Sequence, residues 1–262
     1  MSRTLSDRVA IVAGAGPGIG RSTALALAAD GADVVIAARR PEPLEALGEE
    51  VRAATGRQVL CVPTDISDLA QGTQLVERGL EAFGRLDGLV NVAAHSGPRA
   101  TIADMDWDRY LESVHFNITA TLHLCARAGE AMAATEGGGV VNIGALSSTT
   151  LLPKMTQYTS TKAAMVAASK TLAREMGPQG VRVNVVTPGF TTGEPLDQMF
   201  EQMAQRGGGD AEELKARAAR QAALHRHVDP EDIADACVFL LSDRGRNVTG
   251  VELHVNAGQW IG

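Results

Sequence analysis

Short runs of β-branched residues alternate along this chain with longer stretches rich in alanine and leucine. This alternation is typical of repeated βαβ units, which bring parallel strands into one sheet. Near-continuous apolar runs, such as residues 34–36, indicate strands that helices cover on both faces. The fold class is therefore predicted as α/β, a doubly wound, seven-stranded parallel sheet with helices on both faces. We expect strands at residues 9–13, 33–37, 58–62, 88–91, 140–143, 182–186 and 252–255, and helices near 19–29, 43–54, 68–83, 105–134, 156–176 and 230–241.

The chain contains no linker rich in proline, glycine or serine, so we expect a single domain over residues 1–262. Residues 189–227 are the only long departure from the alternation and form a candidate substrate lid. Within this lid, glycines 207–209 break a helix, and Asp210 is suited to cap the next one. Four apolar residues at helical spacing either cover a substrate or pack on the body of the protein. They are Leu196, Met199, Phe200 and Met203.

Charge and composition argue against several kinds of partner. The formal net charge is −7 and only 3% of residues are aromatic. These values leave no basic patch for nucleic acid or an anionic membrane surface, and few rings on which bases can stack. No apolar run approaches the ~20 residues of a membrane-spanning helix. Three scattered cysteines predict a reducing, cytoplasmic environment. His225 and His227 have no third ligand nearby, so we assign no metal.

A glycine-dense turn follows the first predicted strand and opens an alanine-rich helix. Glycine lets the backbone turn tightly and approach a pyrophosphate, and the free N–H groups at the start of a helix favour negative charge. We therefore predict a dinucleotide site here, in preference to a turn without a ligand. Its residues are Gly14, Pro17, Gly18, Ile19 and Gly20.

The end of the second predicted strand indicates which nucleotide binds. An acidic residue there would hold the ribose hydroxyls, but this chain has Ala38, followed by Arg39 and Arg40. A guanidinium suits a 2′-phosphate, so we favour NADP(H) over NAD(H). The alternative is that both arginines are solvated loop charges. After the third strand, Asp65 and Ile66 either reach the adenine edge or belong to a turn in which Asp65 caps the next helix.

Tyr158 and Lys162 lie four residues apart in a predicted helix, so both side chains share one face. A phenol has an unperturbed pKa of ~10, which must fall by about 3 units for proton exchange near neutral pH. A neighbouring ammonium, with the positive charge of an oxidised nicotinamide, favours the phenolate. Together with the glycine turn, this pair predicts proton transfer coupled to a nicotinamide cofactor.

These motifs, and their order along the sequence, resemble those of the short-chain dehydrogenase/reductase family. The resemblance extends over nearly the whole chain. The resemblance implies a Rossmann fold and reversible hydride transfer between a nicotinamide and a ketone or secondary alcohol. It implies that Tyr158 is the acid or base, that Lys162 tunes it and holds the ribose, and that Asn117 holds a water in a proton relay. Further cofactor contacts implied by the resemblance are Asp65, Asn91, Ala93, Pro188, Gly189 and Thr191.

One departure from the family pattern concerns catalysis. The family has a serine thirteen residues before the tyrosine, where its hydroxyl holds the reacting oxygen, but this chain has Ala145. Loss of one donor to a developing oxyanion typically lowers turnover ~10²–10³-fold. Either a nearby hydroxyl replaces it, with Ser147 closer than Ser148 or Thr149, or the protein binds cofactor with impaired or no catalysis. His95, after the fourth strand, either faces the substrate or is an ordinary loop residue.

We therefore expect an NADP(H)-preferring oxidoreductase that acts on a small carbonyl or alcohol compound. A sugar-nucleotide epimerase could share the tyrosine–lysine pair but would need a larger substrate domain. Small residues on the helix of Tyr158 either pack against another subunit or are buried inside the protein, and the family resemblance favours a homo-oligomer, a tetramer or dimer. These residues are Ala163, Ala164, Ala167 and Ala168.

Overall fold

Seven parallel strands form one sheet in the order β3-β2-β1-β4-β5-β6-β7 in a computed structural model that describes residues 4–261. The predicted doubly wound parallel sheet is confirmed, and the predicted domain limits at 1 and 262 lie outside the described residues. The strands are β1 (Val9–Ala13), β2 (Asp33–Ala38), β3 (Val59–Pro63), β4 (Gly88–Asn91), β5 (Gly138–Ile143), β6 (Val181–Pro188) and β7 (Glu252–Val255).

The strand order reverses beside β1, which lies between β2 and β4. Ile11 of β1 is paired with Val35 on one side and with Leu89 on the other. All five residues of β1 are buried, as expected for a strand that is covered on both faces. In sheets of this kind, ligands bind in the crevice at the carboxyl ends of the strands where the order reverses. The fold therefore places the candidate site beyond the ends of β1 and β4.

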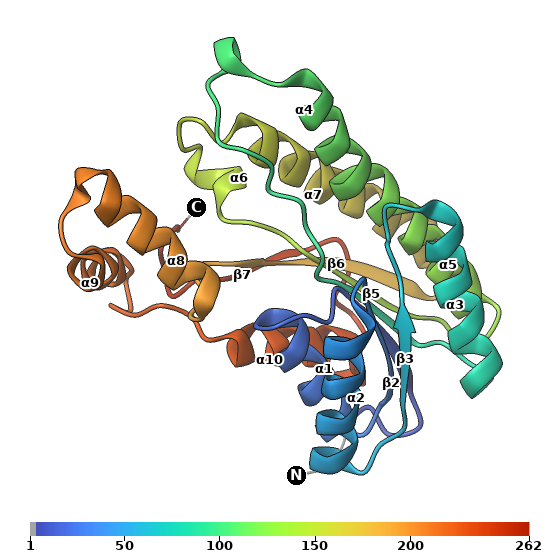
Figure 1. Cartoon of the computed structure of the whole chain (residues 1–262). Helices are drawn as coiled ribbons and strands as arrows, with labels where there is room; N and C mark the ends of the chain where they lie inside the picture. Colours follow the sequence, from blue (N-terminus) through green and yellow to red (C-terminus); the bar gives the residue numbers. More distant parts are fainter. Residues whose placement is uncertain (1–3, 262) are drawn as a thin grey trace.

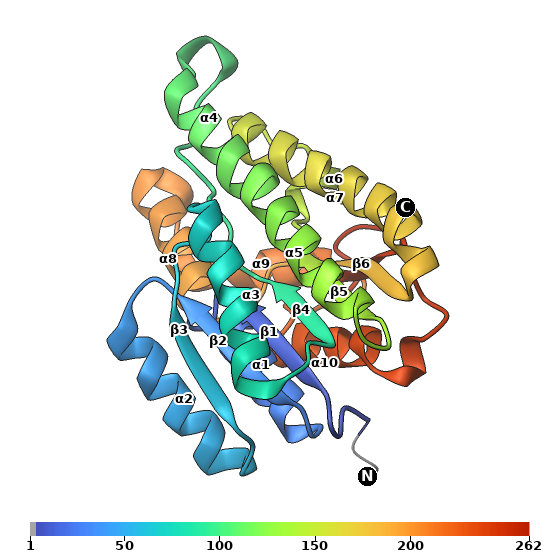
Figure 2. The same cartoon turned by 90° about the vertical axis from the view of Figure 1, so that its right-hand side faces the viewer.

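Two layers of helices cover the sheet (Figure 1). One layer contains α1 (Ile19–Ala29), α2 (Pro41–Thr55) and α10 (Pro230–Leu241), and α1 packs against both of the others. The other contains α3 (Leu69–Phe83), α5 (Thr121–Ala133) and α7 (Thr156–Met176), which lie side by side in Figure 2. Each layer encloses an apolar core against its face of the sheet. Among residues 4–261, no helix has the length and apolar character needed to cross a membrane.

One predicted helix differs from expectation. Residues 105–134 form α4 (Trp107–Val114), a π-helical turn over His115–Ala120, and then α5. Such turns insert an extra residue into the helix, and they occur frequently at functional sites. Several single turns were too short for helical periodicity to reveal. They are the 3₁₀ helices Ile102–Asp104, Gly177–Gln179 and Asp243–Gly245, and the short α6 (Ser147–Thr150).

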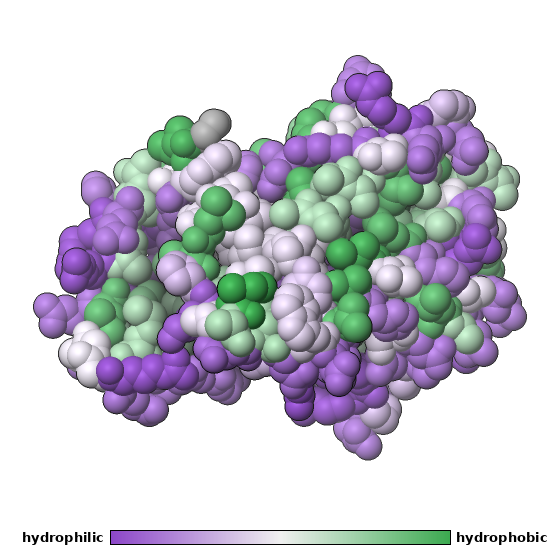
Figure 3. All heavy atoms as spheres, turned by 90° about the horizontal axis from the view of Figure 1, so that it is seen from above, coloured by the Kyte–Doolittle hydropathy of each residue, from purple (hydrophilic) through white to green (hydrophobic). Residues whose placement is uncertain are grey.

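The candidate lid contains two helices, α8 (Glu194–Met203) and α9 (Ala211–Gln221), joined by a π-helical turn over Ala204–Gly208. Gly207 and Gly209 both adopt positive φ, near 95°, which favours glycine and ends the first helix. The Asp210 carboxylate accepts a hydrogen bond from the Glu213 amide at 2.9 Å, as the predicted cap requires. Viewed from above, the surface is hollowed between the lid at the left and the rest of the molecule, and apolar side chains gather around this hollow (Figure 3).

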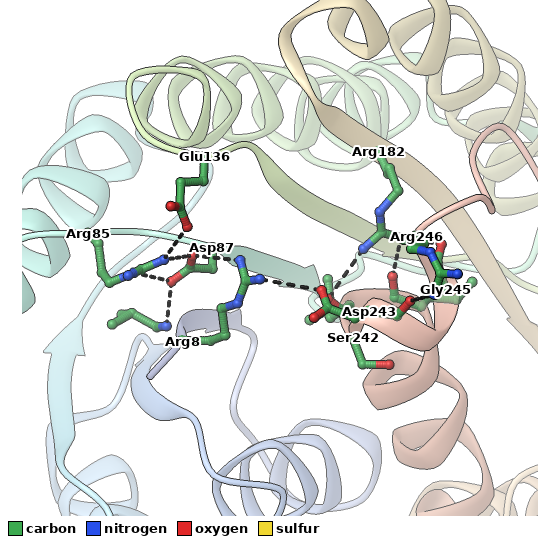
Figure 4. Close-up of polar contacts among 12 residues, drawn as sticks. Arg8, Arg85, Asp87, Glu136, Arg182, Ser242, Asp243, Gly245 and Arg246 are labelled. Carbon is green, nitrogen blue, oxygen red and sulfur yellow. Dashed lines mark hydrogen bonds and ion pairs between the residues drawn. The ribbon is translucent and has the colours of Figure 1, made fainter. Parts of the chain in front are cut away.

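A network of charged side chains lies at the amino-terminal edge of the sheet, opposite the carboxyl ends of the strands (Figure 4). Asp87 is buried there and pairs with Arg8 at 3.2 Å and Arg85 at 2.7 Å. Its second oxygen accepts a hydrogen bond from the Val9 amide at 2.8 Å. Arg8 also reaches Asp243 at 3.4 Å. These contacts join the starts of β1 and β4 to the end of α10, far from the carboxyl edge.

Candidate active site

The glycine turn brings backbone close to backbone at the end of β1. Gly14 has a φ of 98°, and a side chain there would collide with the backbone of Ala93. A side chain at Gly20 would collide with the carbonyl of Gly14. Gly18 occupies the cap position of α1 and offers no side chain to its amides, and within residues 4–261 the amides of Ile19 and Gly20 have no acceptor. Free amides and a helix N-terminus together form a site suited to a phosphate.

Beside this turn, a cavity of about 690 Å³ extends along the end of β2 and is lined by Pro17, Arg39 and Arg40, among others. Arg21 also lines it, but its guanidinium is paired with Glu50, with Nε to Oε2 at 3.0 Å. Arg39 and Arg40 are exposed and have no ion-pair or hydrogen-bond partner within the described part of the chain. The cavity therefore holds two uncompensated positive charges at the position where an adenosine ribose would bind.

Asp65 and Ile66 follow β3 in a turn, and Asp65 does not cap the next helix. Its Oδ1 accepts from the amide of Ser67 at 3.0 Å and from the Ser67 hydroxyl at 2.7 Å. Asp68 caps α3 instead, accepting from the amide of Ala70 at 2.9 Å. The alternative that Asp65 is the helix cap is therefore wrong, because the turn places the cap three residues later. Ile66 is buried.

Asn91, at the end of β4, takes part in a buried chain of amides. Its Nδ2 donates to Asn142 Oδ1 at 2.8 Å, and Asn142 Nδ2 donates to the Ser169 hydroxyl at 2.9 Å. Neither Asn142 nor Ser169 was predicted for the site, although a polar residue inside an apolar strand is a usable signal for Asn142. Ala93 continues from β4, and its amide donates to the carbonyl of Ala13 at 3.0 Å. These contacts join β4 to β5, α7 and the turn after β1.

Tyr158 and Lys162 lie together on α7, as predicted. The Lys162 ammonium is buried, donates to the carbonyl of Ile143 at 2.7 Å and lies 6.0 Å from the centroid of the Tyr158 ring. Burial lowers the pKa of Lys162 to about 8 and raises the pKa of Tyr158 to about 12. In the protein without cofactor the pKa of Tyr158 is thus shifted upward, because burial disfavours the phenolate; the predicted lowering also involves the positive charge of an oxidised nicotinamide. The phenol is therefore protonated at neutral pH.

Asn117 lies in the π-helical turn before α5 and is buried. Its Nδ2 donates to the carbonyl of His95 at 2.8 Å and to the Thr161 hydroxyl at 3.0 Å, and its Oδ1 accepts from the His95 amide at 2.9 Å. The side-chain amide thus binds the loop after β4 to the helix that carries Tyr158. The relay role of Asn117 stays a prediction, and three hydrogen bonds already engage its side-chain amide.

Four hydroxyl residues, 147–150, follow Ala145, and their hydrogen bonds distinguish them. Thr150, which also lines the Tyr158 cavity, donates to the carbonyl of Leu146 at 3.2 Å. Ser148 Oγ donates to the carbonyl of Ala145 at 2.7 Å, and Thr149 Oγ1 donates to the carbonyl of Leu146 at 2.8 Å. The Ser147 hydroxyl oxygen is buried and has no partner among the described residues. An unpartnered buried hydroxyl is unusual in a folded protein. Ser147 is therefore the hydroxyl of this segment that the fold leaves without a partner, and its side chain would have to rotate for this buried oxygen to meet a ligand in the cavity.

Ala145, Ser147 and Tyr158 line one cavity of about 660 Å³. Pro188 and Gly189 line it from the end of β6, while Thr191 lies just beyond and donates to the carbonyl of Gly189 at 3.1 Å. Its remaining wall includes three lid residues, Met199, Phe200 and Met203. The predicted apolar stripe thus lines the cavity, and its members Leu196 and Phe200 are buried, with Phe200 packed against Phe190 and His227.

Other residues predicted for the site lie elsewhere. Among the described residues, His95 does not line the Tyr158 cavity; it lines another, with Asp106 and Arg109. His227 packs against Phe190 and Phe200, with its ring centroid 6.2 Å from each. Conversely, Arg99 and Arg217 line the Tyr158 cavity and were not predicted, because no local motif marks a lone arginine.

Comparisons with known proteins agree with this geometry. The sequence family described as Enoyl-(Acyl carrier protein) reductase matches residues 14–259. The Short-chain reductase protein NovJ of Streptomyces niveus is 33% identical over 97% of this chain and 94% of its own. An A-factor type gamma-butyrolactone 1'-reductase (1S-forming) of Streptomyces virginiae is 35% identical over 97% and 96%, respectively.

Solved structures give the same result. L-sorbose reductase from Gluconobacter frateurii, complexed with NADPH and L-sorbose, superposes with a TM-score of 0.93 at 28% identity, covering 100% of both chains. NAD+-bound xylitol dehydrogenase superposes with a TM-score of 0.91 at 26% identity, covering 97% of this chain and 99% of its own. One neighbour thus holds NADPH and the other NAD+, so likeness of fold does not distinguish the two cofactors.

Proposed function

This chain belongs to the short-chain dehydrogenase/reductase family of NAD(P)-dependent oxidoreductases, and on that premise we propose that it is an NADP(H)-preferring reductase of ketones. In the reverse direction it would oxidise the corresponding secondary alcohols. The observation that carries the proposal is a cavity lined by Tyr158 and by Ser147, whose hydroxyl has no partner among the described residues. The buried Lys162 lies beside Tyr158.

The proton chemistry belongs to Tyr158. When bound, the nicotinamide nucleotide supplies a hydride to a carbonyl carbon or accepts one from an alcohol carbon. In the reductive direction, Tyr158 Oη donates its proton to the substrate oxygen, and in the oxidative direction it takes that proton back. Lys162, when protonated, stabilises the phenolate left after donation. Its bond to the carbonyl of Ile143 fixes the ammonium at the base of the site.

Ser147 takes the part that a serine at position 145 plays elsewhere in the family. Its hydroxyl donates a hydrogen bond to the substrate oxygen while charge develops there. Two observations support this assignment: its oxygen has no partner among the described residues, and the neighbouring hydroxyls of Ser148 and Thr149 are already bonded to backbone carbonyls. A substrate oxygen would satisfy a buried donor that is otherwise without a partner.

The preference for NADP(H) rests on the cavity beside the glycine turn. Arg39 and Arg40 carry uncompensated charge there, Ala38 offers no carboxylate to ribose hydroxyls, and Arg21 is neutralised by Glu50. An additional phosphate on the ribose would meet two guanidinium groups, which bind phosphate through paired hydrogen bonds. The free amides of Ile19 and Gly20 would hold the pyrophosphate.

Substitution of Tyr158 by phenylalanine tests the proposal. The variant loses the proton donor but keeps the ring, so we expect NADPH oxidation with a panel of ketones to fall at least ~10²-fold. Binding of NADPH, followed by fluorescence, should remain within about threefold of the native value. Turnover retained by this variant would refute the assigned mechanism, and loss of NADPH binding would show that the residue supports the fold of the site instead.

Assembly and location extend the proposal. Ala163, Ala164 and Ala167 are exposed on α7, so the alternative that this small-residue face is buried inside the protein is wrong. We propose that the face packs against another subunit of a homo-oligomer, because small side chains allow close approach of helices. Ala164→Glu should reduce the mass measured by light scattering to that of a smaller species.

Three free cysteines are in keeping with the proposed reducing, cytoplasmic location.

A further inference from the structure

The charge of the Tyr158 cavity differs from that of the chain as a whole. The chain carries a net charge of −7, yet the ionised side chains in the lining are two arginines, Arg99 and Arg217, with no aspartate or glutamate. Both guanidinium groups are exposed, and neither forms an ion pair or hydrogen bond within residues 4–261. Elsewhere on the lid, by contrast, Lys215 is paired with Asp197. The cavity therefore presents uncompensated positive charge to whatever enters it.

The two arginines of the lining come from different parts of the fold. Arg217 lies on the lid helix α9, and Arg99 lies in the loop that follows β4 on the body of the protein. In Figure 1 this loop runs beside α4 and α6, and α8 and α9 lie to its left. A single anion held by both would contact the lid and the body at once.

Most of the remaining lining is apolar and adaptable. Methionines and leucines from the lid and from the segment after β5 contribute long, unbranched or flexible side chains, which accept varied apolar shapes. They are Leu146, Leu152, Met155, Met199, Met203 and Leu214. A ligand matched to this cavity therefore has an apolar body, a reacting oxygen at Tyr158 and Ser147, and a negative charge that Arg99 and Arg217 can bind.

We propose that the substrate is an apolar ketone or secondary alcohol that carries a carboxylate, which Arg99 and Arg217 bind. The proposal deepens the ketone reductase function above and rests on it. Guanidinium groups bind carboxylates through paired, charge-assisted hydrogen bonds, and their planar fork suits that group better than a point charge would. Specificity for the acid is thus separate from the chemistry at Tyr158.

The test compares keto acids with their methyl esters, which keep the body and the ketone but remove the charge. Benzoylpropionate, laevulinate and its longer homologues, each with its ester, are assayed by NADPH oxidation. We expect kcat/KM for the acid to exceed that for the ester about tenfold or more. This difference should arise from a lower KM for the acid, with similar kcat for both compounds. Arg217→Gln and Arg99→Gln should each lower this acid-to-ester ratio about tenfold, and added salt should lower it in the native enzyme.

Arg220→Gln is the matched control, because Arg220 lies on the same helix three residues further on but does not line the cavity. Its ratio should stay within about twofold of the native one. If the acid-to-ester ratio falls as far in Arg220→Gln as in Arg217→Gln, the effect is due to the general charge of the lid, and the proposal is overturned. Equal use of acid and ester by the native enzyme would also overturn it.

Binding measurements separate this proposal from the function on which it rests. If no probe is turned over, the ketone reductase assignment fails for these compounds, and calorimetry on the enzyme with NADPH then measures binding directly. Tighter binding of the acid than of its ester, lost in Arg217→Gln, would uphold the anion site by itself. Equal or absent binding of both probes would overturn it.

Discussion

Substitution of Ser147 by alanine is expected to lower turnover while leaving stability unchanged or raised. In the native protein the Ser147 oxygen is buried without a partner among the described residues, and an unsatisfied buried hydroxyl costs about 1–3 kcal/mol. Alanine removes that cost, so the melting temperature should rise by about 2–4 °C for each kcal/mol gained. Loss of the donor to the substrate oxygen should lower kcat about 10²–10³-fold.

Ser148→Ala is the matched control, because Ser148 does not line the cavity and its hydroxyl is used within the fold. Its bond to the carbonyl of Ala145, at 2.7 Å, should be worth about 0.5–1.5 kcal/mol. We therefore expect this variant to melt at a lower temperature and to keep kcat within about threefold. Of these adjacent serines, Ser147 should therefore affect activity without loss of stability, and Ser148 should affect stability without loss of activity.

The assay is NADPH oxidation with the best ketone of a panel, run together with thermal unfolding. Ala145→Ser in the Ser147→Ala background adds a rescue, because a hydroxyl at 145 stands where the family has its serine, in the same cavity. We expect kcat of this double variant to be at least tenfold higher than that of Ser147→Ala. Native turnover in Ser147→Ala would refute the role of this hydroxyl. Activity that appears only when a serine stands at 145 would favour the alternative of a cofactor-binding protein with impaired catalysis.

Three further predictions concern the cofactor, the pH dependence and the fold. Arg39→Gln combined with Arg40→Gln should raise KM for NADPH about tenfold or more and leave KM for NADH within about twofold; equal effects on both would place the arginines outside the phosphate site. Burial lowers the pKa of Lys162 to about 8, so the ammonium that stabilises the phenolate is lost above that pH, and kcat for reduction should fall as pH rises from 8 to 10; a flat profile over this range would refute the role of the lysine charge. Asp87→Asn should lower the free energy of unfolding by about 2 kcal/mol in urea with kcat preserved, because a buried carboxylate with two arginine partners loses its charge at the edge opposite the site; an unchanged midpoint would mean that the network adds nothing.

Much of the fold could be predicted because its signals are local. The bounds of β1, β4 and β7, and of α1, α7 and α10, match the predicted ranges. Apolar runs, a proline at the first position of α10 and the capping box of Asp229 with Asp232 mark these boundaries within a few residues of themselves. The π-helical turn before α5 was missed, since an added residue leaves the apolar pattern of a long helix almost unchanged.

The sequence by itself determined which chemistry this protein can carry: a glycine turn at the start of a helix, a tyrosine and a lysine one turn apart, and arginines where an acid would select NAD(H). Only the tertiary structure decided how these groups behave. Desolvation raises the pKa of Tyr158 because distant segments bury it, and hydrogen bonds to their own turn occupy Ser148 and Thr149 while Ser147 stays free. Arg99 and Arg217 line one cavity because the lid folds over the carboxyl edge of the sheet. Burial and convergence depend on residues far apart in the chain, so no local pattern can encode them.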